Sequence, residues 1–350
     1  MWTTEGTENT EGGSNGEEAA FRVFGAHMQV LFYLSHMDYK KYISDSPPVS
    51  VIGMGTWQLG AAADWKLLSE KDAIRIVEVA LEEGVNFFDT APNYGQGESE
   101  ERLGKALRHT DRSKVILNTK FGHTVDGNID FDPGKIRRSI EGSLRRLQID
   151  YLDSVLFHNP PAELLNGNRA PEHYELLEKL KAEGKIRAYG ASVDTYEEMK
   201  VLLDTTKGSV VEVFFNILHQ DTGRAFEQAE AQGVAVIAKI PLDSGWLSGK
   251  YGSQSIFRGV RSRWSPADIE QRGALVEAVE EILAPDFRLP QAALAFCMAH
   301  DAVSTVIPGS GSLAQLRSNL LSLDKPLPPG LIRKLQLFYK EEVQPLRLPW

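Results

Sequence analysis

The chain has 350 residues, of which 42% are hydrophobic and 25% are charged, as expected for a soluble globular protein with a substantial core. Its net charge of −10 argues against a basic surface of the kind that binds nucleic acids. The single cysteine, Cys297, excludes an intramolecular disulfide, is predicted to be buried, and fits a cytoplasmic protein.

The first part of the chain differs from the rest. Residues 1–18 are rich in Glu, Gly, Thr and Ser, which offers too little apolar surface to offset the entropy of ordering. Residues 19–36 are more apolar, but Arg22, His27 and Gln29 interrupt the roughly 20 apolar residues that a membrane span needs. We therefore expect residues 1–36 to be a disordered N-terminal extension, or the result of a start codon upstream of the natural Met37. Residues 37–350 are predicted to form one domain.

From Met37 onward, short β-branched or aromatic runs alternate with amphipathic stretches. The predicted strands are residues 49–54, 86–89, 115–120, 153–157, 188–192, 211–216, 234–240 and 305–307. The predicted helices between them include residues 70–83, 135–147, 173–183, 196–204, 224–232 and 266–284. Several strands are mostly apolar without alternation, as in a parallel sheet that helices cover on both faces. Eight strand–helix units in series predict an α/β fold, a closed (β/α)8 TIM barrel, with residues 39–48 as a hairpin at its floor.

In such a barrel the active site lies at the C-terminal ends of the strands. Asp89 ends the second predicted strand and Tyr94 follows it, while Lys120 and His158 end the third and fourth. A single Asp at a strand end is more often a helix cap, and a single Lys or Tyr in a loop is usually solvated. Four ionisable groups on three successive strand ends instead indicate a catalytic site.

Together these four groups suit hydride transfer to a carbonyl. The reduction leaves an alkoxide that must be protonated, and tyrosine, with a pKa of about 10, is a poor acid near neutrality. The Lys120 ammonium close to Tyr94 is expected to lower that pKa. Asp89 would keep Lys120 charged and in position, and a neutral His158 could donate a hydrogen bond to the substrate oxygen.

Motifs around these residues closely resemble those of the aldo-keto reductase superfamily. They are Phe87-Phe88-Asp89-Thr90-Ala91-Pro92-Asn93-Tyr94-Gly95, Thr119-Lys120-Phe121-Gly122, Phe157-His158-Asn159-Pro160, Gly190-Ala191-Ser192, Pro241-Leu242-Asp243-Ser244-Gly245-Trp246-Leu247-Ser248-Gly249-Lys250-Tyr251, and Ile307-Pro308-Gly309 with Gln315 and Asn319. The resemblance runs from about Met37 to about Asn319. It implies an NAD(P)(H)-dependent oxidoreductase that interconverts an aldehyde or ketone with its alcohol, and a small-molecule partner of that class.

The resemblance also implies a role for each residue. Tyr94 would be the general acid/base, Lys120 would tune it, Asp89 would orient Lys120, and His158 would orient the carbonyl. The loop 241–250 would cover the cofactor pyrophosphate. The cofactor-binding residues implied in this way are Gly55, Thr56, Trp57, Ser192, Glu212, Pro241, Leu242, Gly245, Lys250, Gly309, Ser310, Gln315 and Asn319.

Three positions depart from the family pattern. Where the family often has Gln at the carboxamide, an aromatic ring stacked on the nicotinamide, and Arg at the 2′-phosphate, this chain has Glu212, Lys239 and Gly311. An ionised Glu cannot donate a hydrogen bond, and glycine lacks the guanidinium fork that suits a phosphate. The family pattern favours NADP over NAD and Gly311 weakens that preference, unless Arg317 or Lys239 supplies the charge.

Other patterns are weaker. Gly53-x-Gly55 resembles a dinucleotide fingerprint, but Gln58 stands where its third glycine belongs. With one cysteine and no HExxH motif, no metal site is predicted. The segment 252–265 contains several arginines and is either a lid over the cofactor or a solvated loop. Aromatic residues near the predicted mouth suggest an aromatic-lined cleft, although some could be core. They are Trp57, Tyr94, Phe121, Phe215, Trp246 and Trp264.

An alternative function is an NADP-binding regulatory subunit of the same fold with little turnover, because some relatives of this family serve channels. The intact set Asp89, Tyr94, Lys120 and His158 favours catalysis. The sequence does not distinguish a monomer from a homo-oligomer.

Overall fold

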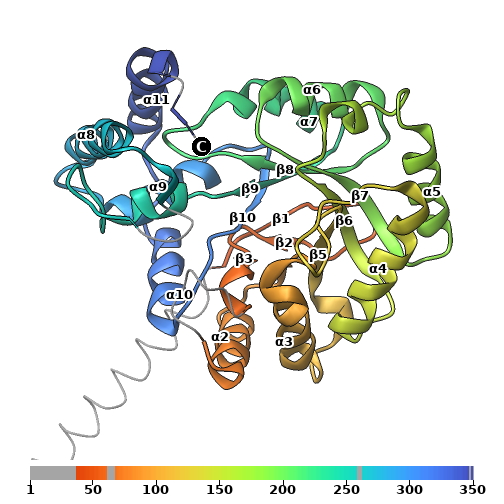
Figure 1. The fold of residues 1–350 in the computed structure, drawn as a ribbon. Coiled ribbons are helices and arrows are strands. Elements are labelled where there is room, and N and C mark those ends of the chain that lie inside the picture. Colours follow the sequence, from red (N-terminus) through yellow and green to blue (C-terminus); the bar gives the residue numbers. More distant parts are fainter. Residues whose placement is uncertain (1–36, 61–67, 258–261, 347, 350) are drawn as a thin grey trace, which may run out of the picture. The chain divides into compact units, whose positions relative to one another are not determined.

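Parallel strands form the centre of the fold (Figure 1). This computed structural model describes residues 37–60, 68–257, 262–346 and 348–349, so the predicted extension 1–36 lies outside the described residues. Within that part of the chain, one sheet contains eight strands. They are β3 (Met54–Gly55), β4 (Phe87–Asp89), β5 (Ile116–Phe121), β6 (Leu152–His158), β7 (Ile186–Val193), β8 (Val210–Phe214), β9 (Ala235–Lys239) and β10 (Val303–Val306).

The sheet closes on itself. Each strand pairs in parallel with the next one in chain order, from β3 to β10. Parallel bridges join Ile52 to Val306 and Gly55 to Gly309, which connects the first strand to the last. The predicted (β/α)8 TIM barrel is therefore confirmed, although the predicted first strand is divided into two short pieces.

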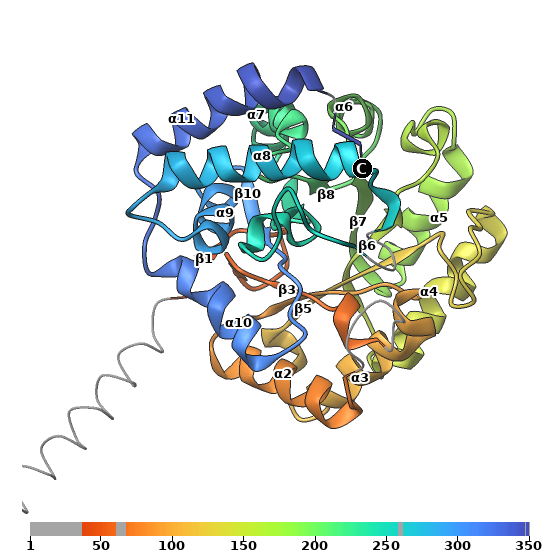
Figure 2. The same ribbon diagram turned by 60° about the vertical axis from the view of Figure 1, so that its left-hand side comes forward.

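Helices follow each strand and surround the sheet (Figure 1). In the described residues they are α2 (Glu70–Glu82), α3 (Glu98–Leu107), α4 (Pro133–Leu147), α5 (Pro171–Ala182), α6 (Tyr196–Thr205), α7 (Phe226–Ala231), α8 (Pro266–Leu283), α9 (Leu289–Met298), α10 (Leu313–Leu320) and α11 (Pro329–Phe338). Figure 2 shows α8 and α11 side by side along one edge of the barrel. Among the helices described, none has the length and apolarity to cross a membrane.

Local sequence signals explain where several helices begin. Thr195 and Glu198 form a reciprocal capping box at α6, and Ser265 and Asp268 form another at α8. Each box satisfies backbone N–H groups that have no partner within the helix. Asp132 caps α4 by accepting a hydrogen bond from the Gly134 N–H, directly before a proline at the first helical position.

The predicted hairpin closes the floor of the barrel. Strands β1 (Tyr39–Lys40) and β2 (Val49–Ser50) pair antiparallel, and Tyr42 in the turn between them is buried. The ring of Tyr42 packs edge-on against Phe87, with 5.4 Å between ring centroids. Side chains from the strands complete this apolar interior cluster, which contains Tyr42, Ile43, Val49, Phe87, Ile116, Leu156, Ala188, Val210, Ala235, Ile237 and Ile307.

Strand alternation carries the interior face from this apolar floor to a polar upper layer. Because successive side chains of a strand point to opposite faces, residues two apart share a face. On β4, Phe87 of the floor is therefore followed on the same face by Asp89. On β5, Ile116 is followed on the same face by Asn118 and then by Lys120. The same alternation aligns His158, Ser192, Glu212 and Lys239 with interior residues of β6 to β9.

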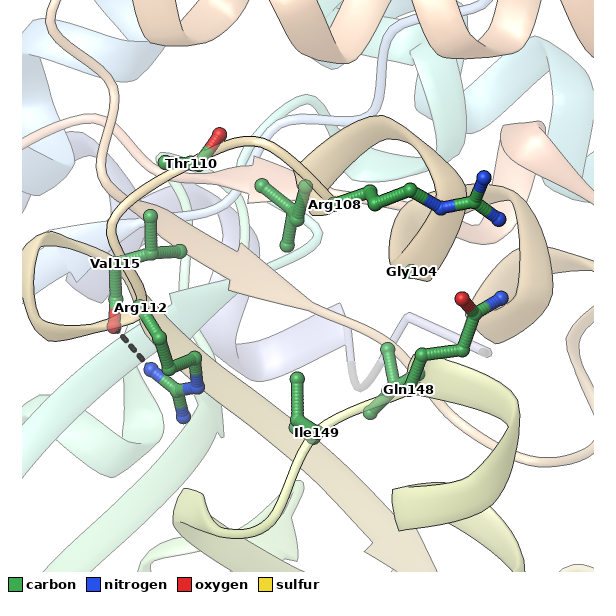
Figure 3. A pocket seen from close by; sticks show the side chains of 9 residues that line it. Gly104, Arg108, Thr110, Arg112, Val115, Gln148 and Ile149 are labelled. Carbon is green, nitrogen blue, oxygen red and sulfur yellow. Dashed lines mark hydrogen bonds between the residues drawn. The ribbon is translucent and has the colours of Figure 1, made fainter.

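A cavity of about 120 Å³ lies on the opposite side of the barrel (Figure 3). It is lined by the ends of α3 and α4 and by the segments that lead into β5 and β6, including Arg108, Val115 and Gln148. The Arg112 guanidinium at its edge donates to the Val115 carbonyl. Because these segments precede their strands, the cavity is remote from the polar upper layer.

Candidate active site

An ion pair between Asp89 and Lys120 forms the centre of the upper layer. Nζ of Lys120 lies 2.6 Å from both carboxylate oxygens of Asp89, and it also donates to the Thr90 carbonyl at 3.3 Å. The Asn118 amide donates a further hydrogen bond of 2.7 Å to Asp89. Both charged side chains are almost fully buried. The sequence predicted this pairing, and the adjacent strands β4 and β5 bring it about.

A second carboxylate also faces the lysine. An oxygen of Glu212, on β8, lies 3.2 Å from Nζ of Lys120. Burial opposes the charge on Lys120, but Asp89 and Glu212 outweigh it and hold the lysine pKa above its usual value. Burial, and then the charge of Glu212, raise the pKa of Asp89 to about 7, against the opposing effect of Lys120. The lysine is therefore held as an ammonium group.

A glycine-rich turn presents Tyr94 at the mouth. Tyr94 begins η2 (Tyr94–Gly97), in which Gly95, Gln96 and Gly97 all have positive φ, between 56° and 94°. Glycine adopts this conformation at little cost, which explains the two glycines around Gln96. The turn brings the Tyr94 ring to the lysine, whose Nζ lies 5.4 Å from the ring centroid.

The acidity of Tyr94 differs from the prediction. Burial raises the pKa of its phenol above the usual value, and Lys120 opposes this increase without reversing it. The sequence predicted a net decrease, because the effect of burial on the phenol was not considered. Asp89 and Glu212 both raise the pKa of the phenol and offset much of the ammonium charge. In this structure the phenol is therefore protonated at neutral pH.

His158 lies on the other side of the tyrosine. Its ring is 5.9 Å from that of Tyr94 in an edge-on arrangement and 4.4 Å from the stacked ring of His123. Burial, and then the nearby charge of Lys120, push the pKa of His158 well below its usual value. The imidazole is therefore neutral, as predicted, and its buried Nδ1 has no hydrogen-bond partner among the residues that the structure describes. His123 was not predicted, because a residue three positions beyond a strand-end lysine has no distinctive signal.

Polar residues also form a second cluster at the ends of β6 to β9. Nζ of Lys239 lies 2.7 Å from Ser192 Oγ, 3.0 Å from Asn159 Oδ1 and 2.9 Å from a carboxylate oxygen of Asp194. Ser192 in turn lies 3.1 Å from Glu212 Oε1, to which it can donate. The sequence identified Ser192, Glu212 and Lys239 separately. Asn159 and Asp194 were missed, although each directly follows the end of a strand.

The loop after β3 contributes three predicted cofactor residues. Gly55 ends β3, while the Thr56 hydroxyl is buried and donates to the Asp89 carbonyl at 2.8 Å. Trp57, which begins η1 (Trp57–Leu59), is 37% exposed, and its ring centroid lies 6.3 Å from that of Tyr94. Of the three, Trp57 is thus the side chain available at the mouth.

The loop after β9 has an unusual backbone. Ile240, Asp243 and Ser244 have φ values of 54°, 48° and 53°, although none is glycine. Such conformations are costly and are concentrated at binding sites. The loop holds Pro241 and Leu242, and Gly245 in η6 (Asp243–Ser248), with Lys250 exposed just beyond it. The fully buried Arg272 of α8 anchors it through an ion pair of 2.6 Å with Asp243.

The loop after β10 contributes the remaining predicted residues. Asn319 of α10 donates to Ser310 Oγ at 3.1 Å and to the Gly309 carbonyl at 3.4 Å. Gln315 accepts a bond of 2.7 Å from the Gly311 N–H. The Gln58 side chain lies directly over Gly309, where a Cβ would be only 2.2 Å from Gln58 Nε2. The two loops therefore meet, and glycine at 309 is required for this approach.

The predicted aromatic-lined cleft is largely wrong. Phe121 and Phe215 are core residues, packed against Phe157 and against Phe226 and Phe296 respectively. Trp246 and Trp264 are buried and pack against each other. Of the six aromatic residues, only Trp57 and Tyr94 retain exposure at the mouth. The segment 252–265 lies partly outside the described residues.

Comparisons with known proteins agree with this fold. The sequence matches the Aldo/keto reductase family over residues 51–339. It is 31% identical over 282 residues to L-galactose dehydrogenase of Arabidopsis thaliana, covering 79% of this chain and 84% of that protein. It is 27% identical to the NADH-specific methylglyoxal reductase of Escherichia coli, covering 79% and 90%.

Among solved structures, the holo form of an aldo-keto reductase from Bacillus halodurans matches with a TM-score of 0.73 and 29% identity, covering 86% of this chain and 96% of that one. The chain belongs to the aldo/keto reductase family, whose members are NAD(P)H-dependent oxidoreductases.

Proposed function

We propose that this protein is an NAD(P)H-dependent carbonyl reductase, working also as the reverse alcohol dehydrogenase, with Tyr94 as its general acid/base. The observation that carries the proposal is the grouping of Tyr94, Lys120, Asp89 and His158 at one mouth. Lys120 lies 5.4 Å from the Tyr94 ring centroid and is held by Asp89 at 2.6 Å. A buried ammonium beside a phenol stabilises the charge that the phenol acquires when it gives up a proton.

The loops at the strand ends fit a nicotinamide dinucleotide. The loop after β9 holds Ile240, Asp243 and Ser244 at positive φ although none is glycine, and such strain is concentrated at binding sites, which supports a role for this loop at the pyrophosphate. Ser192 and Glu212 would face the carboxamide, and Asn159 is a further candidate there because its amide belongs to the same hydrogen-bonded cluster. Some buried polar atoms, including Gln58 Oε1, have no hydrogen-bond partner within the described part of the chain and are available to a ligand. The full set of cofactor residues proposed is Gly55, Thr56, Trp57, Ser192, Glu212, Pro241, Leu242, Gly245, Lys250, Gly309, Ser310, Gln315 and Asn319.

Residues of the chain itself would carry out the proton transfer. When bound, the reduced cofactor supplies the hydride that attacks the carbonyl carbon. The neutral His158 imidazole orients the carbonyl by donating a hydrogen bond to its oxygen. Tyr94 transfers its hydroxyl proton to that oxygen, and Lys120 stabilises the phenolate that remains. In the oxidative direction the same phenolate accepts the proton of the alcohol.

We further propose that the substrates are small and oxygen-rich. The partly exposed His123 ring, stacked on His158, adds a second imidazole beside the position proposed for the carbonyl. Burial lowers the pKa of His123, so this ring too is neutral and can hydrogen-bond an adjacent hydroxyl or carbonyl. The names of two relatives refer to L-galactose and methylglyoxal, which both carry adjacent oxygen functions.

Steady-state kinetics with NADPH and NADH against a panel of aldehydes tests the proposal. Tyr94→Phe is expected to lower kcat by about 10²–10⁴-fold, the usual contribution of a general acid. Cofactor affinity, measured by protein fluorescence, should stay within about threefold, because only the proton-transferring oxygen is lost. Tyr39→Phe is the matched control, since that hydroxyl bonds the Gly84 carbonyl near the barrel floor.

A Tyr94→Phe variant that retains kcat within about threefold of the parent would refute the assignment of the acid. If the parent binds NADPH but turns over none of the carbonyls, the alternative of a cofactor-binding regulatory subunit is favoured instead.

A further inference from the structure

Glu212 is oriented toward the lysine as well as toward the carboxamide position. One of its carboxylate oxygens lies 3.1 Å from Ser192 Oγ, and the other lies 3.2 Å from Nζ of Lys120. The second oxygen is buried and makes no hydrogen bond within the described structure. Its role is therefore electrostatic, and it places a second negative charge on the ammonium that Asp89 already holds.

We propose that Glu212 is a positioning residue that, together with Asp89, acts on the Lys120–Tyr94 pair and sets how strongly Tyr94 holds its hydroxyl proton. This inference rests on the proposed function. It adds a carboxylate to the four residues that the family resemblance implies. The shared ammonium links the two carboxylates, since each contacts the same nitrogen from a different strand.

Lys239 provides the opposing charge. Its ammonium donates to Ser192 Oγ at 2.7 Å, and the Ser192 hydroxyl is thereby free to donate its own proton toward Glu212. Glu212 therefore lies between two ammonium groups, with direct contact to Lys120 and an intervening hydroxyl toward Lys239. The ionisable groups that face this arrangement are Asp89 of β4, Lys120 of β5, Tyr94 of η2, His158 of β6, Asp194 after β7, Glu212 of β8, Lys239 of β9 and Tyr42 from the floor.

The sign of the effect follows from these charges. A carboxylate near Tyr94 and Asp89 disfavours their ionised forms, so Glu212 raises the pKa of both groups. Replacing Glu212 by Gln keeps the shape and the acceptor for Ser192 but removes the charge. Both pKa values should then fall. Reduction needs an ionised Asp89, so the acid limb of its pH profile should move to lower pH, whereas burial keeps the Tyr94 limb above the range of the assay.

The test measures kcat/KM for carbonyl reduction between about pH 5 and pH 10. Glu212→Gln is expected to move the acid limb down by about one pH unit, the usual effect of a neighbouring charge. Glu212→Asp, which keeps the charge, should restore the parent profile. Lys239→Met removes the opposing charge and should move the acid limb upward, by less because Ser192 intervenes. The double variant should lie close to the parent.

A second readout requires no turnover. The carboxyl carbon of Asp89, labelled with ¹³C and assigned with Asp89→Asn, should titrate with a midpoint near the pKa of about 7 in the parent and at lower pH in Glu212→Gln. If the parent lacks turnover yet this midpoint moves, the proposed function fails while the linkage of Glu212 to Asp89 stands.

Profiles and midpoints that stay unchanged in Glu212→Gln, with only a uniform loss of rate, would overturn the inference, because a purely structural role lowers activity equally at every pH. If Glu212→Gln does not fold, Lys239→Met decides: an upward shift supports the proposal, and no shift refutes it.

Discussion

We expect the preference between NADPH and NADH to depend on a side chain that is missing at position 311. Gly311 lies in the loop after β10, where its N–H donates to Gln315. A Cβ at this position would meet only Gln315 Oε1 at 3.4 Å and Gln58 carbons at 3.9 and 4.0 Å, all ordinary contacts, so the backbone at position 311 accommodates the Cβ of an arginine. Lys239 cannot provide the missing charge, because its ammonium is bound to Ser192, Asn159 and Asp194.

The size of the effect follows from the contact that would be gained. A charge-assisted hydrogen bond to the 2′-phosphate contributes about 1.5–3 kcal/mol. At about 1.4 kcal/mol per tenfold, Gly311→Arg should shift the NADPH:NADH affinity ratio by roughly ten- to a hundredfold toward NADPH. The parent should accordingly discriminate less than relatives that carry the arginine. Arg317 is exposed on α10 and is the remaining cation to be tested at this loop.

Fluorescence titration of both reduced cofactors measures this ratio directly in the parent, in Gly311→Arg and in Gly311→Gln. The Gln variant controls for added volume without charge. Raising the salt concentration should reduce the gain from arginine, because screening weakens exposed charge pairs. A parent that already prefers NADPH by about a thousandfold, or an unchanged ratio in Gly311→Arg, would show that position 311 does not face the 2′-phosphate.

Two further predictions concern stability. Gly190→Ala should cost about 3 kcal/mol or more, measured by urea unfolding, because its Cβ would fall 1.6 Å from the Val210 carbonyl oxygen in a closely paired strand. Gly252→Ala, whose Cβ meets nothing within 4 Å, is the control and should unfold at nearly the parent urea concentration. Arg272→Met should cost about 3–5 kcal/mol and weaken NADPH binding, since it leaves Asp243 as an unpaired buried charge in the cofactor loop. A loss below about 1 kcal/mol would contradict that reasoning.

The barrel and the central residues could be predicted because one physical rule connects them. Parallel strands in a closed barrel bring their C-terminal ends to the same face, so residues distant in sequence meet once the strands are recognised. Asp89 and His158 end β4 and β6, Lys120 is the second-last residue of β5, and β4 and β5 are adjacent in the sheet. Tyr94 needed more than this rule, because an irregular turn presents it.

The prediction of an aromatic-lined cleft was wrong for reasons that differ between residues. Phe121 directly follows the interior-facing Lys120, and strand alternation therefore directs it outward against the helices. Phe215 is three positions after the interior-facing Glu212, so alternation directs it outward too. It could have been excluded from the predicted cleft in the same way. For Trp246 and Trp264 no local rule applies, because they are buried against each other across the loop that joins β9 to α8.

The two departures near the proposed nicotinamide position, Glu212 and Lys239, are best understood as one change. Alone, Glu212 would leave a buried carboxylate competing with Asp89 for a single ammonium, and an unbalanced buried charge is strongly destabilising. Without Glu212, Lys239 would place an ammonium beside Lys120 and His158. That ammonium would oppose the charge that Lys120 must keep. Strands β8 and β9 are neighbours, and the Ser192 hydroxyl joins the two side chains with bonds of 2.7 and 3.1 Å. The sequence alone does not reveal that Glu212 and Lys239 compensate each other. They are 27 positions apart, and the bridging Ser192 lies on a third strand.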